Sequence, residues 1–162
     1  MDGYKIGVVG CAGRMGRMLL HTIAETDGCQ IAGGTEAAGN PAVGRDVGEL
    51  AGLGELGIAV GADPVELFAK ADAVIDFTAP AASAAHAELA AQAMAVHVIG
   101  TTGLSEEQQA VIEKAALHTA LVQAPNMSLG VNLLMDLVER VAGILEPDYD
   151  IEIVEMHHRH KV

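Results

Sequence analysis

The last stretch of the sequence, EMHHRHKV, places three histidines, an arginine and a lysine within five positions. In an extended strand, His158 and His160 would share one face, and His157, Arg159 and Lys161 would share the other. Arg and Lys bind carboxylates and His can deliver a proton, so the cluster suits an anionic substrate such as a dicarboxylate. Two histidines on one face could instead bind a metal, but the neighbouring cations oppose this and we expect no metal site. A solvated, charged strand end is the third alternative, and the interrupted His pattern does not favour a purification tag.

A second stretch, VVGCAGRMGR, joins a predicted strand to a predicted helix, with Gly10, Gly13 and Gly16 three residues apart. Glycines permit a tight turn and a close approach to a pyrophosphate, and the following helix N-terminus presents free N–H groups. Arg14 adds a full positive charge beside them. The spacing differs from the usual GxGxxG dinucleotide motif, but the flanking strand and helix favour the same use. The alternative is an ordinary turn between a strand and a helix.

Glu36 lies twenty residues beyond Gly16, directly after the second predicted strand. An acidic side chain at this place can accept hydrogen bonds from an adenosine ribose, although it could also be a solvated surface charge. The next residue is Ala37, and nothing adjacent would neutralise a 2′-phosphate. This pattern mildly favours NAD over NADP, although Arg45 in the following loop could reach such a phosphate.

Three further segments follow predicted strands: DFTAP (76–80), GTTG (100–103) and APNMS (124–128). Ligands of a doubly wound sheet bind beyond the carboxyl ends of its strands, so we expect these segments to line the same site. Their polar side chains could hold a ribose or a carboxamide: Thr78, Thr101, Thr102 and Asn126. Phe77 could lie against a flat ring. Alternatively, Asp76 and Thr78 cap the next helix and Phe77 belongs to the core.

The elements that would position these residues alternate along the chain. We expect strands at 4–10, 30–35, 71–78, 96–100 and 120–124, and helices at 14–28, 64–71, 79–94, 105–117 and 128–145. Residues 36–54 read as an irregular, Gly-rich loop, and 57–60 as a short strand. This alternation predicts an α/β protein with a Rossmann-like, doubly wound parallel sheet.

Residues 148–156, DYDIEIVEM, differ because apolar and acidic side chains alternate. This pattern predicts a half-buried strand in a sheet with one solvated face, which is typically antiparallel. The architecture is therefore expected to change after about residue 128.

The formal net charge of −13, from nine Lys and Arg against twenty-two Asp and Glu, argues against nucleic acid or an anionic membrane as the main partner. Cys11 and Cys29 lack metal or redox spacing, which favours free thiols in a reducing compartment. No signal peptide or apolar run of membrane-spanning length is apparent. We therefore expect a cytoplasmic protein.

Five motifs carry a family resemblance: GxxGRMGR, IDFT, GTTG, PNxSxGVN and ExHHRHK. In this order they resemble the bacterial 4-hydroxy-tetrahydrodipicolinate reductase (dihydrodipicolinate reductase) family of lysine and diaminopimelate biosynthesis, from residue 4 to 162. The resemblance implies a dinucleotide-binding Rossmann-like domain, here 1–128. The beginning of an α+β substrate-binding and oligomerisation domain, usually part of a homotetramer, would follow at 129–162. The implied reaction transfers a hydride from NADH or NADPH to a cyclic imine dicarboxylate, giving tetrahydrodipicolinate.

Carried over by position, the resemblance also implies site residues. Cofactor contacts would come from Gly10, Cys11, Ala12, Gly13, Arg14, Met15, Glu36, Gly100, Thr101, Thr102, Ala124, Pro125, Asn126 and Met127. His157 is implied as the proton donor or acceptor, Lys161 as a second proton donor, and His158 as a contact for a substrate carboxylate.

The sequence departs from the family at three points. Many relatives have Arg where this chain has Ala37, and many have Phe where it has Met127. The family continues beyond the HHRHK motif with a stretch like DAPSGT, whereas this sequence stops at Val162, so we expect a fragment that lacks most of the substrate domain.

Two other functions fit part of the pattern. A stand-alone dinucleotide sensor would explain the glycine loop and Glu36, but it has no need of the HHRHK cluster. Another Rossmann oxidoreductase, such as a homoserine or semialdehyde dehydrogenase, is the second rival. An acylating semialdehyde dehydrogenase needs a catalytic Cys in its second domain, and Cys11 and Cys29 are both too early in the chain.

Overall fold

The computed structural model describes residues 3–145 and 148–156, and the chain forms two compact units, Met1–Pro125 and Asn126–Val162. The first unit contains a five-stranded sheet in the order β2-β1-β3-β4-β5. Every paired neighbour is parallel. The strands are β1 (Tyr4–Val9), β2 (Cys29–Thr35), β3 (Ala73–Asp76), β4 (Val96–Ile99) and β5 (Leu121–Gln123). The predicted Rossmann-like α/β fold is confirmed.

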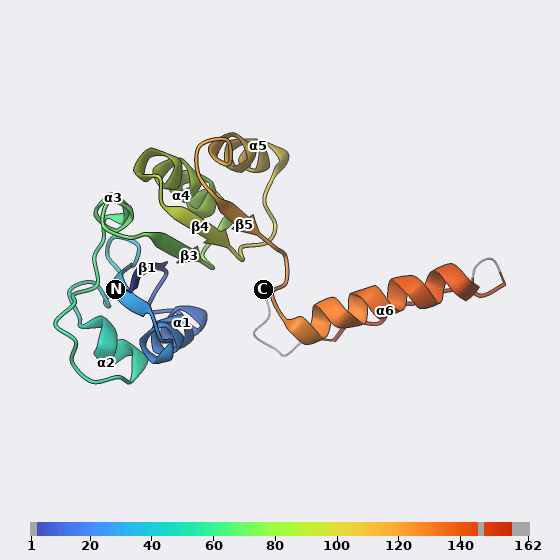
Figure 1. Ribbon diagram of the computed structural model, residues 1–162, viewed down its shortest axis with the longest axis horizontal. Helices are drawn as coiled ribbons and strands as arrows, with labels where there is room; N and C mark the ends of the chain where they lie inside the picture. The colour runs from blue at the N-terminus through green and yellow to red at the C-terminus, as the bar shows by residue number, and fades with distance from the viewer. Residues whose placement is uncertain (1–2, 146–147, 157–162) are drawn as a thin grey trace. The chain divides into compact units, whose positions relative to one another are not determined.

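Five helices of this unit cover the sheet (Figure 1). They are α1 (Arg14–Glu25), α2 (Val47–Ala51), α3 (Pro64–Phe68), α4 (Pro80–Ala93) and α5 (Glu106–Ala115). Helices α1 and α2 pack on one face of the sheet, and α3, α4 and α5 on the other.

The two faces follow from the alternation of side chains along β1. Val8 is buried with Leu20 of α1, whereas the next residue, Val9, is buried with Leu67 and Phe68 of α3 on the opposite face. Both faces of a strand at the centre of a parallel sheet are covered, which is why β1 is a continuous apolar run from Ile6 to Val9.

The prediction of an irregular loop at 36–54 is wrong in one part, because α2 forms within this segment. Asp46 begins this helix by accepting hydrogen bonds from the backbone N–H groups of Gly48 and Glu49, and Gly52 ends it in a left-handed conformation. The short strand predicted at 57–60 is also absent from the described residues. Only isolated bridges form there, Asp46 with Ala59 and Thr35 with Gly61.

Other local predictions agree with the structure. Ser105 and Gln108 form the expected capping box at the start of α5, each side chain bonding the other's backbone. Pro64 occupies the first turn of α3, where Asp63 caps the helix.

The second unit contains one long helix, α6 (Leu129–Leu145). The strand predicted at 148–156 does not form in the structure, where the described residues of this segment are irregular and exposed. A strand needs a neighbour to satisfy its backbone, and the second unit offers none among its described residues. None of the helices that the structure describes is both long and apolar enough to cross a membrane. The cytoplasmic location stays a prediction.

Candidate functional site

The glycine-rich turn after β1 is built by close backbone contacts. The N–H groups of Gly10 and Cys11 both donate to the carbonyl oxygen of Thr35, at 2.8 and 3.2 Å, which ties the turn to the end of β2. Gly10 has φ +68°, and a Cβ there would lie 2.8 Å from the Thr78 methyl carbon. A Cβ on Gly16 would overlap the backbone of Gly10 and Cys11. Glycine is therefore needed at both ends of the turn, for a left-handed angle at one and for helix packing at the other.

Helix α1 begins at this turn with its first N–H groups available. The N-cap residue, Gly13, provides no side-chain hydrogen bond, and the first turn holds no acidic residue. The first N–H groups of a helix have no partner within the helix, and the helix dipole adds partial positive charge. Arg14 and Met15 lie exposed in this first turn. The turn therefore fits a phosphate-bearing group such as the pyrophosphate of a dinucleotide.

The thiol of Cys11 points away from this surface. Its side chain is fully buried in the core, and a Cβ on Gly34 would lie 2.7 Å from its Sγ. Burial, followed by the nearby Glu36 carboxylate, raises the pKa of the Cys11 thiol to about 12. Only the backbone of Cys11 is thus available to a ligand.

Glu36 is bound to the glycine turn and is not a freely solvated charge. One carboxylate oxygen accepts from the Ala12 N–H at 2.8 Å, and the other accepts from Asn40 Nδ2 at 3.0 Å. The side chain is half-buried. These contacts fix a carboxylate beside the turn, at the position expected for a ribose ligand.

Two cavities meet Glu36. The first, of about 370 Å³, is lined by Gly10, Thr35, Glu36, Ala37, Ala62, Pro64, Thr78, Ala79, Ala82 and His86. The second, of about 320 Å³, is lined by Ala12, Gly13, Arg17, Glu36, Asn40, Pro41, Ala42, Arg45 and Leu50. The first is mostly apolar with one carboxylate and one imidazole, and the second contains two guanidinium groups, those of Arg17 and Arg45, together with Glu36.

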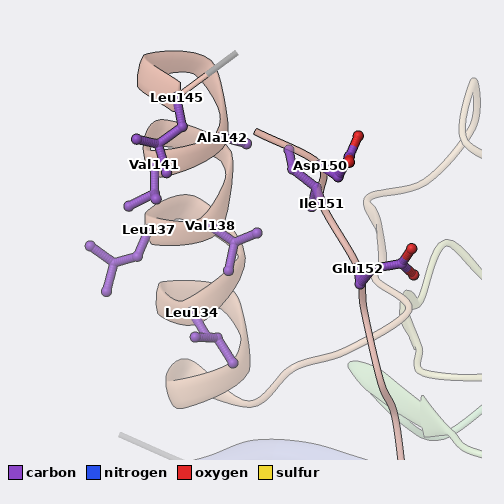
Figure 2. A pocket seen from close by; sticks show the side chains of 9 residues that line it. All are labelled: Leu134, Leu137, Val138, Val141, Ala142, Leu145, Asp150, Ile151 and Glu152. Carbon is purple, nitrogen blue, oxygen red and sulfur yellow. The ribbon is translucent and has the colours of Figure 1, made fainter. Parts of the chain in front are cut away.

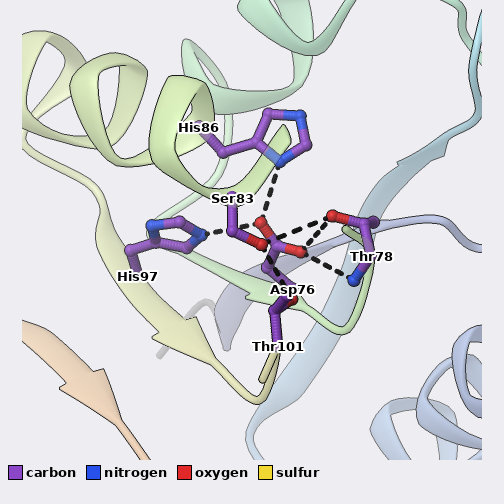
Figure 3. A network of polar contacts seen from close by, with 6 residues as sticks. All are labelled: Asp76, Thr78, Ser83, His86, His97 and Thr101. Carbon is purple, nitrogen blue, oxygen red and sulfur yellow. Dashed lines mark hydrogen bonds and ion pairs between the residues drawn. The ribbon is translucent and has the colours of Figure 1, made fainter. Parts of the chain in front are cut away.

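A buried carboxylate at the end of β3 organises the wall of the first cavity (Figure 3). Asp76 is fully buried, and its Oδ1 accepts from the Thr78 N–H at 3.0 Å and from the Thr78 hydroxyl at 2.6 Å. Its Oδ2 lies 2.8 Å from His86 Nδ1 and 3.3 Å from His97 Nε2. Ser83 continues the network by donating to Thr101 at 2.7 Å. Burial by itself raises the pKa of Asp76, but the hydrogen bonds from His86, His97 and Thr78 outweigh it and hold the pKa well below its usual range.

Sequence reasoning missed the histidines of this network. The sequence offers Asp76 and Thr78 as helix caps, but the Asp76 carboxylate binds side chains from α4 and β4 in addition to Thr78. The available signal was a histidine in each of two largely apolar segments, His86 in an Ala-rich helix and His97 within a buried strand.

The loops that follow the parallel strands β3 and β4 lie at the same edge of the sheet. Phe77 is half-buried, and its ring packs over Gly100 so closely that a Cβ there would overlap it. Thr101 is buried, whereas Thr102 is exposed. Thr101 and Thr102 line a cavity of about 310 Å³ that also includes Gln123 and Pro125 after β5. Ala124 is held by its N–H, which donates to the Ile99 carbonyl at 3.2 Å.

Asn126 and Met127 belong to the second unit. Asn126 accepts from the Ser128 N–H at 2.8 Å, and its carbonyl accepts from Asn132 Nδ2 at 3.0 Å, so it stabilises the start of α6. Met127 is exposed. The three residues expected to handle substrate, His157, His158 and Lys161, lie outside the described residues. Among the residues that are described, no group of three or more His, Cys, Asp or Glu side chains could hold a metal.

An apolar groove runs along α6 within the second unit (Figure 2). The groove of about 460 Å³ is lined by Leu134, Leu137, Val138, Val141, Ala142, Leu145, Asp150, Ile151 and Glu152. Most of its large side chains remain exposed, including Leu134 at 60% and Val141 at 53%.

Two family models match the chain in sequence order. Residues 4–127 match the model described as dihydrodipicolinate reductase, N-terminus, and residues 130–162 match the corresponding C-terminus model. The chain belongs to the dihydrodipicolinate reductase family. The resemblance read from the sequence motifs is thereby confirmed.

Curated relatives agree with this family, and solved structures share the fold. The chain is 56% identical over 161 residues to 4-hydroxy-tetrahydrodipicolinate reductase of Dinoroseobacter shibae, covering 99% of this chain and 60% of that protein. A dipicolinate-bound dihydrodipicolinate reductase from Paenisporosarcina sp. TG-14 has a TM-score of 0.68 at 23% identity, covering 86% of this chain and 53% of that one. An oxidoreductase from Agrobacterium radiobacter, in complex with NAD+, L-tartaric acid and magnesium, has a TM-score of 0.59 at 19% identity. The match covers 86% of this chain and 41% of that one. At such low identity, these two structures show the shared fold alone.

Proposed function

We propose that this chain is the cofactor-binding part of an NAD(P)H-dependent 4-hydroxy-tetrahydrodipicolinate reductase, which reduces its substrate to tetrahydrodipicolinate. The observation that carries the proposal is the 56% identity to a relative of that name across nearly the whole chain. The chain spans 60% of that relative's length, so the activity belongs to a longer protein.

The dinucleotide would bind along the carboxyl edge of the sheet in the first unit. Its pyrophosphate would meet the uncapped N-terminus of α1, between Gly10 and Met15. Glu36 would accept hydrogen bonds from the adenosine ribose. The nicotinamide end would lie toward the loops after β3, β4 and β5, which carry Phe77, Thr78, Gly100, Thr101, Thr102, Ala124 and Pro125 in the first unit. Asn126 and Met127 stay predicted cofactor contacts.

When bound, the reduced dinucleotide supplies the hydride. The residues that this chain provides for the rest of the reaction are in the HHRHK motif. His158 would bind a substrate carboxylate, and Arg159 adds positive charge beside it. His157 would donate or accept the proton that accompanies hydride addition, and Lys161 would be a second proton donor.

NAD is the favoured cofactor, with NADP accepted less well. Glu36 presents a carboxylate that would repel a 2′-phosphate, and Ala37 supplies no compensating charge. Arg17 and Arg45 line the second cavity together with Glu36 and would provide positive charge for that phosphate. Comparing NADH and NADPH dissociation constants for the chain and its Arg45→Ala variant tests this. Arg45→Ala should weaken NADPH selectively, and an equal effect on both would contradict it.

The catalytic roles require a protein that continues past Val162 as the relatives do. In that protein, His157→Gln and Lys161→Ala should each lower kcat by about 10²- to 10⁴-fold while NADH still binds. His118→Gln and Lys114→Ala, at exposed positions on and just after α5, are matched controls and should keep wild-type turnover. Wild-type turnover in either motif variant would remove that residue from the mechanism.

A stand-alone dinucleotide sensor remains the rival function. Both functions predict NADH binding by the 162-residue chain, so calorimetry on that chain tests only the cofactor site. Turnover by the longer protein separates them, since a sensor would bind NADH without consuming the substrate. The longer reductase would also assemble into a homotetramer, which sedimentation velocity measures directly.

A further inference from the structure

We propose that Asp76, supported by His97, is a positioning residue for the nucleotide cavity. It holds the His86 ring with a hydrogen-bond acceptor toward the bound dinucleotide, and it holds Thr78 against the glycine turn. This role presupposes the dinucleotide site proposed above. No step of the proposed reaction uses Asp76, His86 or His97.

The first step of the argument is the hydrogen placement on the two rings. An ionised carboxylate only accepts hydrogen bonds, so the ring nitrogen that faces it must carry the hydrogen. The pKa of Asp76 lies well below its usual range because, although burial raises it, His86, His97 and Thr78 stabilise the ionised form more strongly. His86 Nδ1 and His97 Nε2 are therefore the N–H donors. In a neutral ring the other nitrogen is then a bare acceptor.

The second step is where that acceptor lies. His86 lines the cavity that contains Gly10, Glu36 and Thr78, and its side chain is 12% exposed. Figure 3 shows its second nitrogen on the side of the ring away from Asp76. Because Nδ1 is occupied by Asp76, Nε2 is the only ring atom left to accept an N–H or O–H of a ligand.

The third step concerns His97, which has no exposed surface. Its Nε2 faces Asp76, while its Nδ1 is buried with no hydrogen-bond partner among the described residues. Leaving the buried Nδ1 unpaired costs free energy, so the hydrogen-bonding needs of His97 do not by themselves explain a histidine at this place. The Phe68 ring packs against both imidazoles, with centroids 5.7 Å from His97 and 5.9 Å from His86. The two rings are thus held firmly on one carboxylate oxygen.

The fourth step is the other oxygen. Oδ1 receives both the backbone N–H and the hydroxyl of Thr78, which fixes the Thr78 rotamer. The Thr78 methyl then occupies the space that a Cβ on Gly10 would need. One carboxylate therefore sets a ring in the cavity wall and a methyl group beneath the glycine turn.

Asp76→Asn tests this role because it keeps the shape and changes the hydrogen bonding. With the Asn amide group toward His86, Nδ1 must become the acceptor and Nε2 the N–H donor. The ¹⁵N chemical shifts of the imidazole, assigned with His86→Gln, report the tautomer. We expect the Nδ1–H form of His86 in the wild-type chain at neutral pH and the Nε2–H form in Asp76→Asn.

Dissociation constants for NADH and ADP-ribose provide the functional readout. Asp76→Asn should weaken both by about tenfold, because a cavity acceptor has become a donor. Asp72→Asn is the matched control, since this exposed carboxylate just before β3 accepts only the Lys5 N–H in the structure, and it should leave both constants within about twofold.

Three outcomes would overturn the role: an Nε2–H tautomer in the wild type, unchanged affinities in Asp76→Asn, or the same weakening in Asp72→Asn. The wild-type tautomer is read without Asp76→Asn, so it decides the matter even if that variant fails to fold. If the wild-type chain binds neither NADH nor ADP-ribose, the proposed cofactor site fails and this role fails with it. If the wild type binds and Asp76→Asn binds equally well, only the positioning role fails.

Discussion

Replacing Thr78 by Val would measure the strength of the buried network. Val has the shape of Thr, so the methyl that packs against Gly10 is retained and no cavity is created. What is lost is the hydroxyl that donates to Asp76 Oδ1 at 2.6 Å. A hydrogen bond to a charged group contributes about 1.5–3 kcal/mol, and the free energy of unfolding should fall by about that amount.

Thr22→Val is the matched control for this substitution. The Thr22 hydroxyl donates to the Met18 carbonyl at 2.9 Å, on the exposed side of α1. That bond involves no charge and competes with water, so its loss should change the free energy of unfolding by less than about 0.5 kcal/mol.

Urea unfolding of the 162-residue chain, followed by far-UV circular dichroism, compares the two variants. With an m-value of about 2 kcal/mol/M, Thr78→Val should lower the unfolding midpoint by about 1 M, and Thr22→Val by less than about 0.3 M. Equal midpoints for the two variants would refute the reasoning, because the Asp76 network would then contribute no more than a solvated helix contact.

Three further predictions use other parts of the molecule. Because the pKa of Asp76 is lowered on folding, its contribution to stability is present above its unfolded pKa and is lost as the pH falls through the folded pKa. Below about pH 3.9 the free energy of unfolding, measured with urea, should therefore fall more steeply for the wild type than for Asp76→Asn, by up to about 1.4 kcal/mol per pH unit. Parallel pH slopes for the two proteins would contradict this. In the native chain a thiol reagent should modify Cys29, which is partly exposed, and should modify the buried Cys11 only after unfolding in urea. Rapid labelling of both thiols in the native chain would contradict this, because it would show that the core around Cys11 opens. The apolar groove of α6 should bind a hydrophobic dye in the 162-residue chain and not in a protein extended to the length of the relatives, and dye fluorescence that survives the extension would mean that this groove stays open.

Several features of the fold were predictable from local sequence. The apolar runs at β1, β3 and β4 and the helices between them are local signals, and their alternation is typical of a parallel sheet. Capping residues such as Ser105 and Asp63 act within one turn of their helices, so their roles need no tertiary information. Helix α2 was missed because it has only five residues among glycines, and its cap Asp46 also bonds the N–H groups of Leu56 and Ile58, which are distant in sequence.

The strand predicted at 148–156 shows the limit of a periodic pattern. Alternating apolar and acidic residues favour a half-buried strand, but a strand forms only where a partner supplies backbone hydrogen bonds. The described residues of the second unit contain α6 and no sheet, so the pattern has nothing to pair with among them.

For the candidate site, the sequence by itself determined which location and which type of ligand to predict. The glycine turn, Glu36 and the loops after the strands are read from residue types and from their places beside predicted elements, because the carboxyl ends of parallel strands meet at one edge. What only the tertiary structure decided is which side chains meet there. Asp76, His86 and His97 come from β3, α4 and β4, and residues up to 21 positions apart share one buried carboxylate. No local pattern encodes that contact, because it depends on strand order and on how α4 packs across the sheet.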